Sequence, residues 1–181
     1  MNYIISGVIS FVVALIVSGI VAPIVNARLA DKNRKRAIAD KYKIDALDEF
    51  IGISFNLDQS AKNCVGSIID MQTGNIITGD ISPQMEIVAK NLIDFGNQGE
   101  LFTTAQLKYQ RFFGDEIKSQ IDGLSEMYTN IYMDIRKSYA DFSNTGSVFE
   151  LKVGDGTLDN IAKKNNNLID SLEKQKEQIL K

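Results

Sequence analysis

The sequence predicts an all-α protein in which one N-terminal transmembrane helix precedes an antiparallel helical bundle with coiled-coil-like helices. Three observations lead to this fold class. An uncharged apolar run opens the chain, later stretches repeat apolar residues every three or four positions, and only two prolines occur in 181 residues. Because proline interrupts helices and is frequent in turns, its scarcity favours long helices over a turn-rich β fold.

We expect three segments: a transmembrane anchor at 1–25, a basic juxtamembrane helix at 26–43 and a soluble helical bundle at 44–181. The run from Tyr3 to Val25 holds no charged residue, and the first charged side chain is that of Arg28. As a helix the run would extend about 34 Å at 1.5 Å per residue, enough for a hydrocarbon core of about 30 Å. A cleaved signal peptide is the alternative, but such a peptide has basic residues before a shorter apolar core.

Small side chains recur along the predicted membrane helix at every fourth position. Small residues at this spacing let two helix backbones approach closely, and membrane helices associate through such packing. We therefore expect self-association or a protein partner at this face, although Gly, Ala and Ser are also common in membrane helices that have no partner. The predicted packing residues are Ser6, Ser10, Ala14, Ser18 and Ala22.

Lysine and arginine gather just after the apolar run. The segment 26–43 contains seven of them against two aspartates, whereas 44–181 has 13 basic and 21 acidic residues. Basic residues beside a membrane helix mark its cytoplasmic side, so we expect a single-pass cell-membrane protein with its N-terminus outside and the bulk of the chain in the cytoplasm. Each basic side chain near an anionic leaflet contributes on the order of 1 kcal/mol of attraction. The residues expected to contact anionic lipid are Arg28, Lys32, Arg34, Lys35 and Arg36.

The lipid bilayer is therefore the first expected partner. Nucleic acid is not expected, because the acidic remainder of the chain would repel phosphate.

The first soluble helix is predicted to begin at Ile44 and to run for about 30 residues, until a turn region begins at Gly74. Its apolar residues form one seam, which two polar residues, Ser54 and Asp58, interrupt. A seam of this kind on several helices of similar length is typical of an antiparallel bundle.

Two further helices are expected before residue 143. The shorter begins at Ser82, which is followed by a proline as helix starts often are, and ends near Gly96. The longer covers about 101–142 and has a possible break at Gly114. Gly123 lies within it, and because glycine costs about 1 kcal/mol relative to alanine in a helix, we expect it to mark a close contact between helices.

The last helix has the most regular pattern of all. It is expected to follow an extended connector at 147–153 and to start at Thr157, a residue that can cap a helix. Asn165 occupies a core-type position, where a polar residue can fix the register of a coiled coil. The heptad positions are Leu158, Ile161, Asn165, Leu168, Leu172, Gln175 and Ile179.

Catalytic chemistry has little support in this sequence. Histidine is absent, which removes the commonest general base and the commonest metal ligand. Cys64, the single cysteine, lies on an apolar seam and is expected to be a buried small side chain rather than a nucleophile. Six aromatic residues could line a pocket, but such seams more often fill bundle cores; they are Tyr109, Phe112, Phe113, Tyr128, Tyr132 and Tyr139. We predict no enzyme activity, no cofactor, no metal site and no evident small-molecule substrate.

The expected function is that of a membrane-anchored helical interaction or scaffold protein, which holds a partner or a second copy of itself at the membrane. Two alternatives stay open. An oligomerising membrane effector, similar in action to lysis proteins or toxins, would use the small-residue face to perturb the bilayer. An exported sensor-like bundle would need the opposite orientation in the membrane.

Overall fold

The computed structural model describes residues 18, 21–78, 82–145 and 155–181 and divides the chain into two units, 1–43 and 44–181. Every regular element in these described ranges is helical, and none is a strand. The all-helical fold class is therefore confirmed, and the second unit is a helical bundle. The elements are α2 (Ala22–Thr78), α3 (Ser82–Tyr109), the 3-10 helix η2 (Gln110–Phe112), α4 (Asp115–Thr145) and α5 (Asp155–Leu180).

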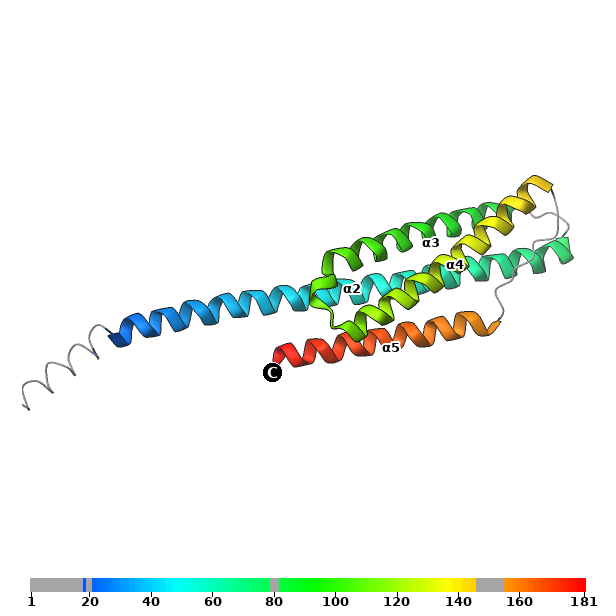
Figure 1. Cartoon of the computed structure of the whole chain (residues 1–181). Helices are drawn as coiled ribbons and strands as arrows, with labels where there is room; N and C mark the ends of the chain where they lie inside the picture. The colour runs from blue at the N-terminus through cyan, green and yellow to red at the C-terminus, as the bar shows by residue number, and fades with distance from the viewer. Residues whose placement is uncertain (1–17, 19–20, 79–81, 146–154) are drawn as a thin grey trace, which may run out of the picture. The chain divides into compact units, whose positions relative to one another are not determined.

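In the second unit, the later part of α2 packs with α3, α4 and α5, and each helix runs antiparallel to the one before it (Figure 1). The backbone of α4 lies closest to those of α3 and α5. Alternating helix directions are what short connections produce, and this arrangement directs one apolar face of every helix into a shared core.

The core follows the 3-4 spacing of the sequence. Along α4 the predicted seam is buried from Ile117 to Ile135, and Phe142 at its end is partly buried. Phe50 of α2 packs against two aromatic rings, with its centroid 5.1 Å from that of Phe102 and 4.9 Å from that of Phe113. Tilted and edge-on ring pairs at these separations add about 0.5–1.5 kcal/mol beyond the area they bury.

Helix α2 is longer than predicted, with 57 residues from Ala22 to Thr78. The basic segment 26–43 is helical as expected. However, the turn predicted at Gly74 is wrong, because α2 passes through that residue. A single glycine costs a helix only about 1 kcal/mol, which neighbouring turns can offset.

The predicted helix end near Gly96 is also wrong, since α3 runs without a break to Tyr109. Phe95, Phe102 and Ala105 are all buried on the face that α3 turns to the core. Burying a large apolar side chain stabilises by about 1.5–3 kcal/mol, more than the helix loses at one glycine. Packing therefore keeps this helix intact where local propensity favours a stop.

The break predicted at Gly114 is confirmed. Helix α3 ends at Tyr109, and Phe113 adopts an extended backbone with φ −88° and ψ 136°. The amide of Lys118 then donates to the carbonyl of Gly114 across 3.0 Å, which closes the first turn of α4. Asp115 and Glu116 in this turn are favourable beside the positive end of the helix dipole.

Helix α5 begins at Asp155, two residues before the predicted start, so Thr157 lies inside the first turn and does not precede it. The heptad prediction is confirmed at the core. Ile161, Asn165, Leu168 and Leu172 are buried, and the remaining heptad positions are partly buried. The predicted connector 147–153 lies outside the described residues.

Among the described residues, no helix combines the length and the apolar character needed to cross a bilayer. The predicted span from Tyr3 to Val25 lies outside these residues except for position 18 and positions 21–25.

The glycines at 96 and 123 occupy opposite environments, and the prediction for Gly123 is wrong. A Cβ added at Gly123 would meet nothing within 4 Å, so no neighbouring helix presses on this residue. At Gly96 an added Cβ would lie 3.0 Å from the hydroxyl oxygen of Tyr132 and 3.2 Å from two of its ring carbons. The close contact between helices is therefore at Gly96.

We expect Gly123→Ala to raise the free energy of unfolding by up to about 1 kcal/mol, because alanine favours the helix and nothing obstructs its methyl group. Gly96→Ala should gain less or lose stability, because its methyl group displaces Tyr132. Urea denaturation of the two variants measures the difference. An equal gain in both would contradict the assignment of the close contact to Gly96.

Candidate functional site

The small residues predicted to pack in the membrane are mostly outside the described residues, as Ser6, Ser10 and Ala14 are. Ser18 is exposed, and Ala22, the first residue of α2, is half-buried. The role of this face in helix packing stays a prediction.

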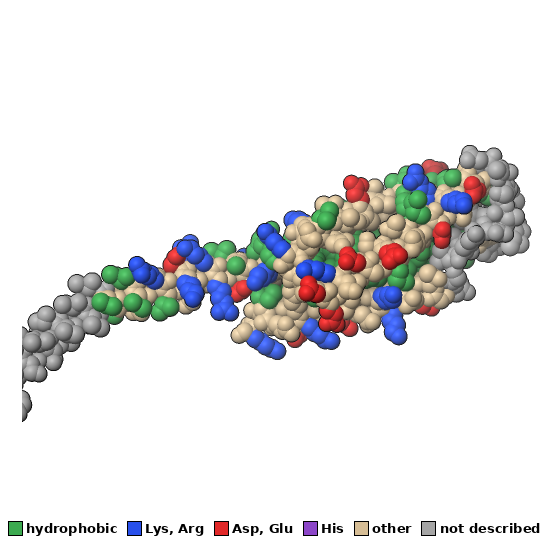
Figure 2. Space-filling model, viewed as in Figure 1, with side chains coloured by type: hydrophobic (Ala, Val, Ile, Leu, Met, Phe, Trp, Pro, Cys, Tyr) green, Lys and Arg blue, Asp and Glu red, His purple; other side chains and the backbone are tan. Residues whose placement is uncertain are grey.

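The five predicted lipid-contact residues are all exposed on α2 (Figure 2). At 3.6 residues per turn, Arg28, Lys32, Lys35 and Arg36 project within an arc of about 100°, whereas Arg34 projects away from it. Lys35 pairs with Asp31 at 2.7 Å, and Arg36 lies 3.8 Å from an Asp40 oxygen.

These two ion pairs leave the surface basic. Exposed pairs contribute only about 0–1 kcal/mol and do not hold their side chains in place. We call Arg28, Lys32, Lys35 and Arg36 the basic face of α2.

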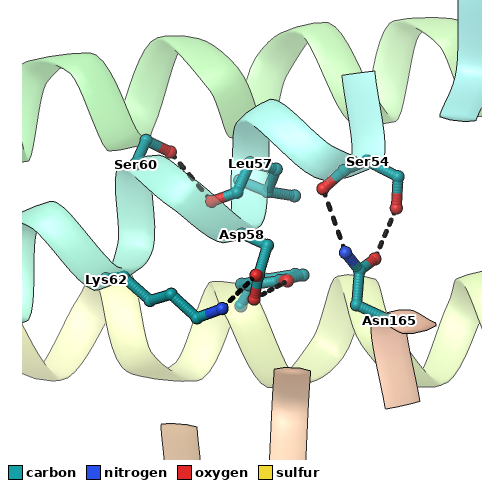
Figure 3. A network of polar contacts seen from close by, with 7 residues as sticks. Ser54, Leu57, Asp58, Ser60, Lys62 and Asn165 are labelled. Atoms are coloured by element: carbon teal, nitrogen blue, oxygen red, sulfur yellow. Dashed lines mark hydrogen bonds and ion pairs between the residues drawn. The ribbon is translucent and has the colours of Figure 1, made fainter. Parts of the chain in front are cut away.

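A layer of buried polar side chains crosses the bundle, and it contains both polar interruptions predicted in the α2 seam (Figure 3). The Ser54 hydroxyl donates to the side-chain oxygen of Asn165, and the Asn165 amide donates to the Ser54 carbonyl across 3.3 Å. Because a buried polar group without a partner is costly, this reciprocal pair fixes α2 against α5 at one register.

One turn further along α2, Asp58 is 6% exposed and accepts two bonds. The Tyr128 hydroxyl of α4 donates to it across 3.2 Å, and the Lys62 ammonium does so across 2.6 Å (Figure 3). Burial, followed by the charge of Asp58 and this hydrogen bond, raises the pKa of Tyr128 above its usual value. The phenol therefore stays neutral and keeps donating to the carboxylate, which satisfies a charge that would otherwise destabilise the core.

A second polar cluster lies on the surface between α2 and α3. Tyr109 donates to the Glu49 carboxylate, and the Lys108 ammonium lies 3.3 Å from the same carboxylate and 4.5 Å from the centre of the Tyr109 ring. The Tyr109 hydrogen bond, opposed by slight burial and assisted by Lys108, lowers the pKa of Glu49. These contacts join α2 to α3, so we assign the cluster a structural role.

A cavity of about 380 Å³ lies between α3 and α4. Four aromatic side chains, Phe95, Phe102, Tyr128 and Tyr132, form its walls. The Phe95 ring meets Tyr132 edge-on, with the centroids 5.7 Å apart. Buried Leu57 of α2 closes the inner side. Both possibilities considered for the aromatic residues therefore hold, because Tyr128 is buried in the core and also lines a pocket.

The sequence indicated Tyr128 and Tyr132 as possible pocket residues, but the contribution of α3 to this cavity was missed. Its residues on α3 include Gly96 and Gly99, and Gly96 was interpreted as the end of a helix. The available signal was the pair of glycines flanked by Phe95 and Phe102 at helical spacing, since such a pair hollows one face of an aromatic helix.

A smaller hollow of about 220 Å³ lies between α4 and α5, where Gly123 is one of the lining residues. Its other side chains are polar, and the side-chain oxygen of Gln120 there is buried without a hydrogen-bond partner in the described part of the chain. Among the described residues of this lining, Lys164 supplies the one charged group.

The described ranges offer few groups for metal binding or for nucleophilic chemistry. They contain no group of three or more His, Cys, Asp or Glu residues that could hold a metal ion. Cys64 is fully buried, as predicted, and burial raises the pKa of its thiol from 9.0 to about 12. A thiol with such a pKa is a poor nucleophile at neutral pH.

No protein family, no curated protein and no solved structure shows significant similarity to this chain.

We expect Asn165→Ala to lower the free energy of unfolding by about 1–3 kcal/mol, because it removes the buried partner of Ser54. The double variant Ser54→Ala with Asn165→Ala should cost less than the sum of Ser54→Ala and Asn165→Ala made singly. Urea denaturation of the two single variants and the double variant measures the coupling. Additive losses would show that the pair does not act as a unit.

Cys64 should report on the unfolding of α2. We expect a disulfide reagent to leave it unmodified at pH 8 in the folded chain and to modify it fully in denaturant. Between pH 9 and about 12 the unfolded thiol ionises while the folded thiol stays neutral, so stability should fall as the pH rises through this window. Comparison with Cys64→Ala isolates this contribution. Rapid modification of the native chain would contradict the buried placement.

Proposed function

We propose that the chain is a membrane-anchored helical interaction module. The observation that carries this proposal is the order of its segments. An uncharged apolar run of about 23 residues, from Tyr3 to Val25, leads directly into a helix with an exposed basic face. A run of this length is long enough to cross a hydrocarbon core of about 30 Å. The basic face would then lie at the lipid headgroups, where each side chain adds on the order of 1 kcal/mol to the attraction of an anionic surface.

In this proposal the bundle at 44–181 is the part that meets a partner. The bundle buries a continuous apolar core and satisfies its buried polar layer internally, so it does not need the first segment to fill its interior. The small-residue face at 6–22 would bring a second copy or a helical partner alongside in the membrane. The excess of basic residues in 26–43 favours an N-terminus outside the cell and a bundle in the cytoplasm.

The cavity between α3 and α4 favours a second candidate, a sensor-like bundle that binds a small molecule and lies on the outer side of the membrane. Ligand sites in helical bundles are built between facing helices, and many have volumes of about 300–1,000 Å³. This candidate keeps the anchor and reverses the orientation, so one experiment separates the two.

The test uses the full chain with a C-terminal fluorescent protein. We expect the fusion to stay in carbonate-washed membranes and to fluoresce there. Val12→Arg with Ile16→Arg should release it, since each arginine at the centre of a membrane helix costs about 2.5–3.5 kcal/mol of insertion. Val12→Leu with Ile16→Leu is the matched control and should stay bound.

A wild-type fusion found in the soluble fraction would overturn the anchor. A dark fluorescent fusion, together with an active C-terminal phosphatase fusion, would overturn the cytoplasmic orientation and favour the exported sensor-like bundle.

A further inference from the structure

The cavity between α3 and α4 has a lining of unusual chemistry. Four aromatic side chains line it, and among its described lining residues the only carboxyl or amino group is the carboxylate of Glu100, which is exposed. None of these described residues is a lysine or an arginine. The ammonium of Lys62 is not part of the lining. It lies 2.6 Å from the carboxylate of Asp58, the residue to which the Tyr128 hydroxyl donates. The cavity lining therefore combines four aromatic rings, one carboxylate and the uncharged polar side chains of Asn97, Ser125 and Thr129.

Two glycines of α3 leave space in the cavity. Gly96 and Gly99 lie one turn apart on α3, and a Cβ at Gly99 would meet nothing within 4 Å. Tyr132 takes the space next to Gly96, and its ring is held edge-on against Phe95. The aromatic walls are thus fixed before any ligand arrives, which lowers the entropic cost of binding.

We propose that this cavity binds a small organic cation, an ammonium group carried on an apolar body. Aromatic faces attract cations through their quadrupoles, and the attraction strengthens where water is excluded. The carboxylate of Glu100, an exposed lining residue, supplies the opposite charge. The apolar body lies against Leu57 and Phe102, which are buried at the inner side. An anionic ligand would meet the Glu100 carboxylate, and none of the described lining residues is basic.

This inference does not depend on the membrane anchor or on the orientation of the chain. It uses only residues of α2, α3 and α4 within the second unit. Loss of the anchor in the fusion experiment would leave it intact, and absence of binding here would leave the anchor intact.

Three probes with the same phenyl body test the chemical class: 2-phenylethylammonium, neutral 2-phenylethanol and anionic phenylacetate. We would measure their dissociation constants by calorimetry on the purified full chain in a non-ionic detergent. The cation should bind about tenfold more tightly than the alcohol, as a partly desolvated cation–π contact provides, and the anion should bind most weakly. Glu100→Gln should reduce the preference for the cation over the alcohol to about threefold or less.

A pair of glycine variants tests the location. Gly99→Leu places a side chain in the cavity lining and should abolish binding of the cation. Gly123→Leu is its matched control, because Gly123 is also a helical glycine with open space at Cβ but lines the separate hollow between α4 and α5. It should leave the affinity unchanged, and thermal unfolding verifies that both variants fold.

Equal affinities for all three probes, or tightest binding of the alcohol or the anion, would overturn the chemical class. Binding that survives Gly99→Leu, or that Gly123→Leu removes, would overturn the location.

Discussion

The reciprocal hydrogen bonds between Ser54 and Asn165 are the constraint on which the rest of the bundle depends. α4 lies close to α3 and α5 along its backbone, whereas α2 is joined to its neighbours through side chains. An apolar seam alone would let such a helix slide by one turn, about 5.4 Å, and still bury apolar surface. A buried polar pair forbids this, because the displaced helix would leave both groups without partners. With α2 fixed, Phe50 reaches Phe102, and Asp58 reaches Tyr128.

The interface of α3 and α4 depends on a residue without a side chain as well as on large side chains. Gly96 lets the Tyr132 ring approach the α3 backbone, and the aromatic groups around it stand edge to face instead of filling the space completely. The same bundle thus has a buried polar pair between α2 and α5 and a hollow of about 380 Å³ between α3 and α4. Tyr128 lines this hollow and also donates to Asp58 of α2.

The sequence was informative where burial repeats with the period of a helix. The seams of α4 and α5 and the core position of Asn165 could be identified because each buried residue has a buried neighbour three or four places away. Helix ends were predicted less well. Gly74 and Gly96 carry a local preference for a turn, but burial on the same helix outweighs it. For the cavity, the sequence offered the glycines of α3 and the aromatic residues beside them. Its position and volume depend on the packing of three helices, whose relative rotation no local pattern contains.

Tyr128 belongs both to the buried polar layer and to the wall of the cavity. Its ring shapes the space where a ligand would lie, and its hydroxyl holds the carboxylate of Asp58. Exchanging the tyrosine for phenylalanine would keep the wall but leave that carboxylate with Lys62 alone. Exchanging it for a smaller residue would enlarge the cavity at the expense of the core. A substitution of Tyr128 would therefore change the shape of the cavity and the stability of the fold together.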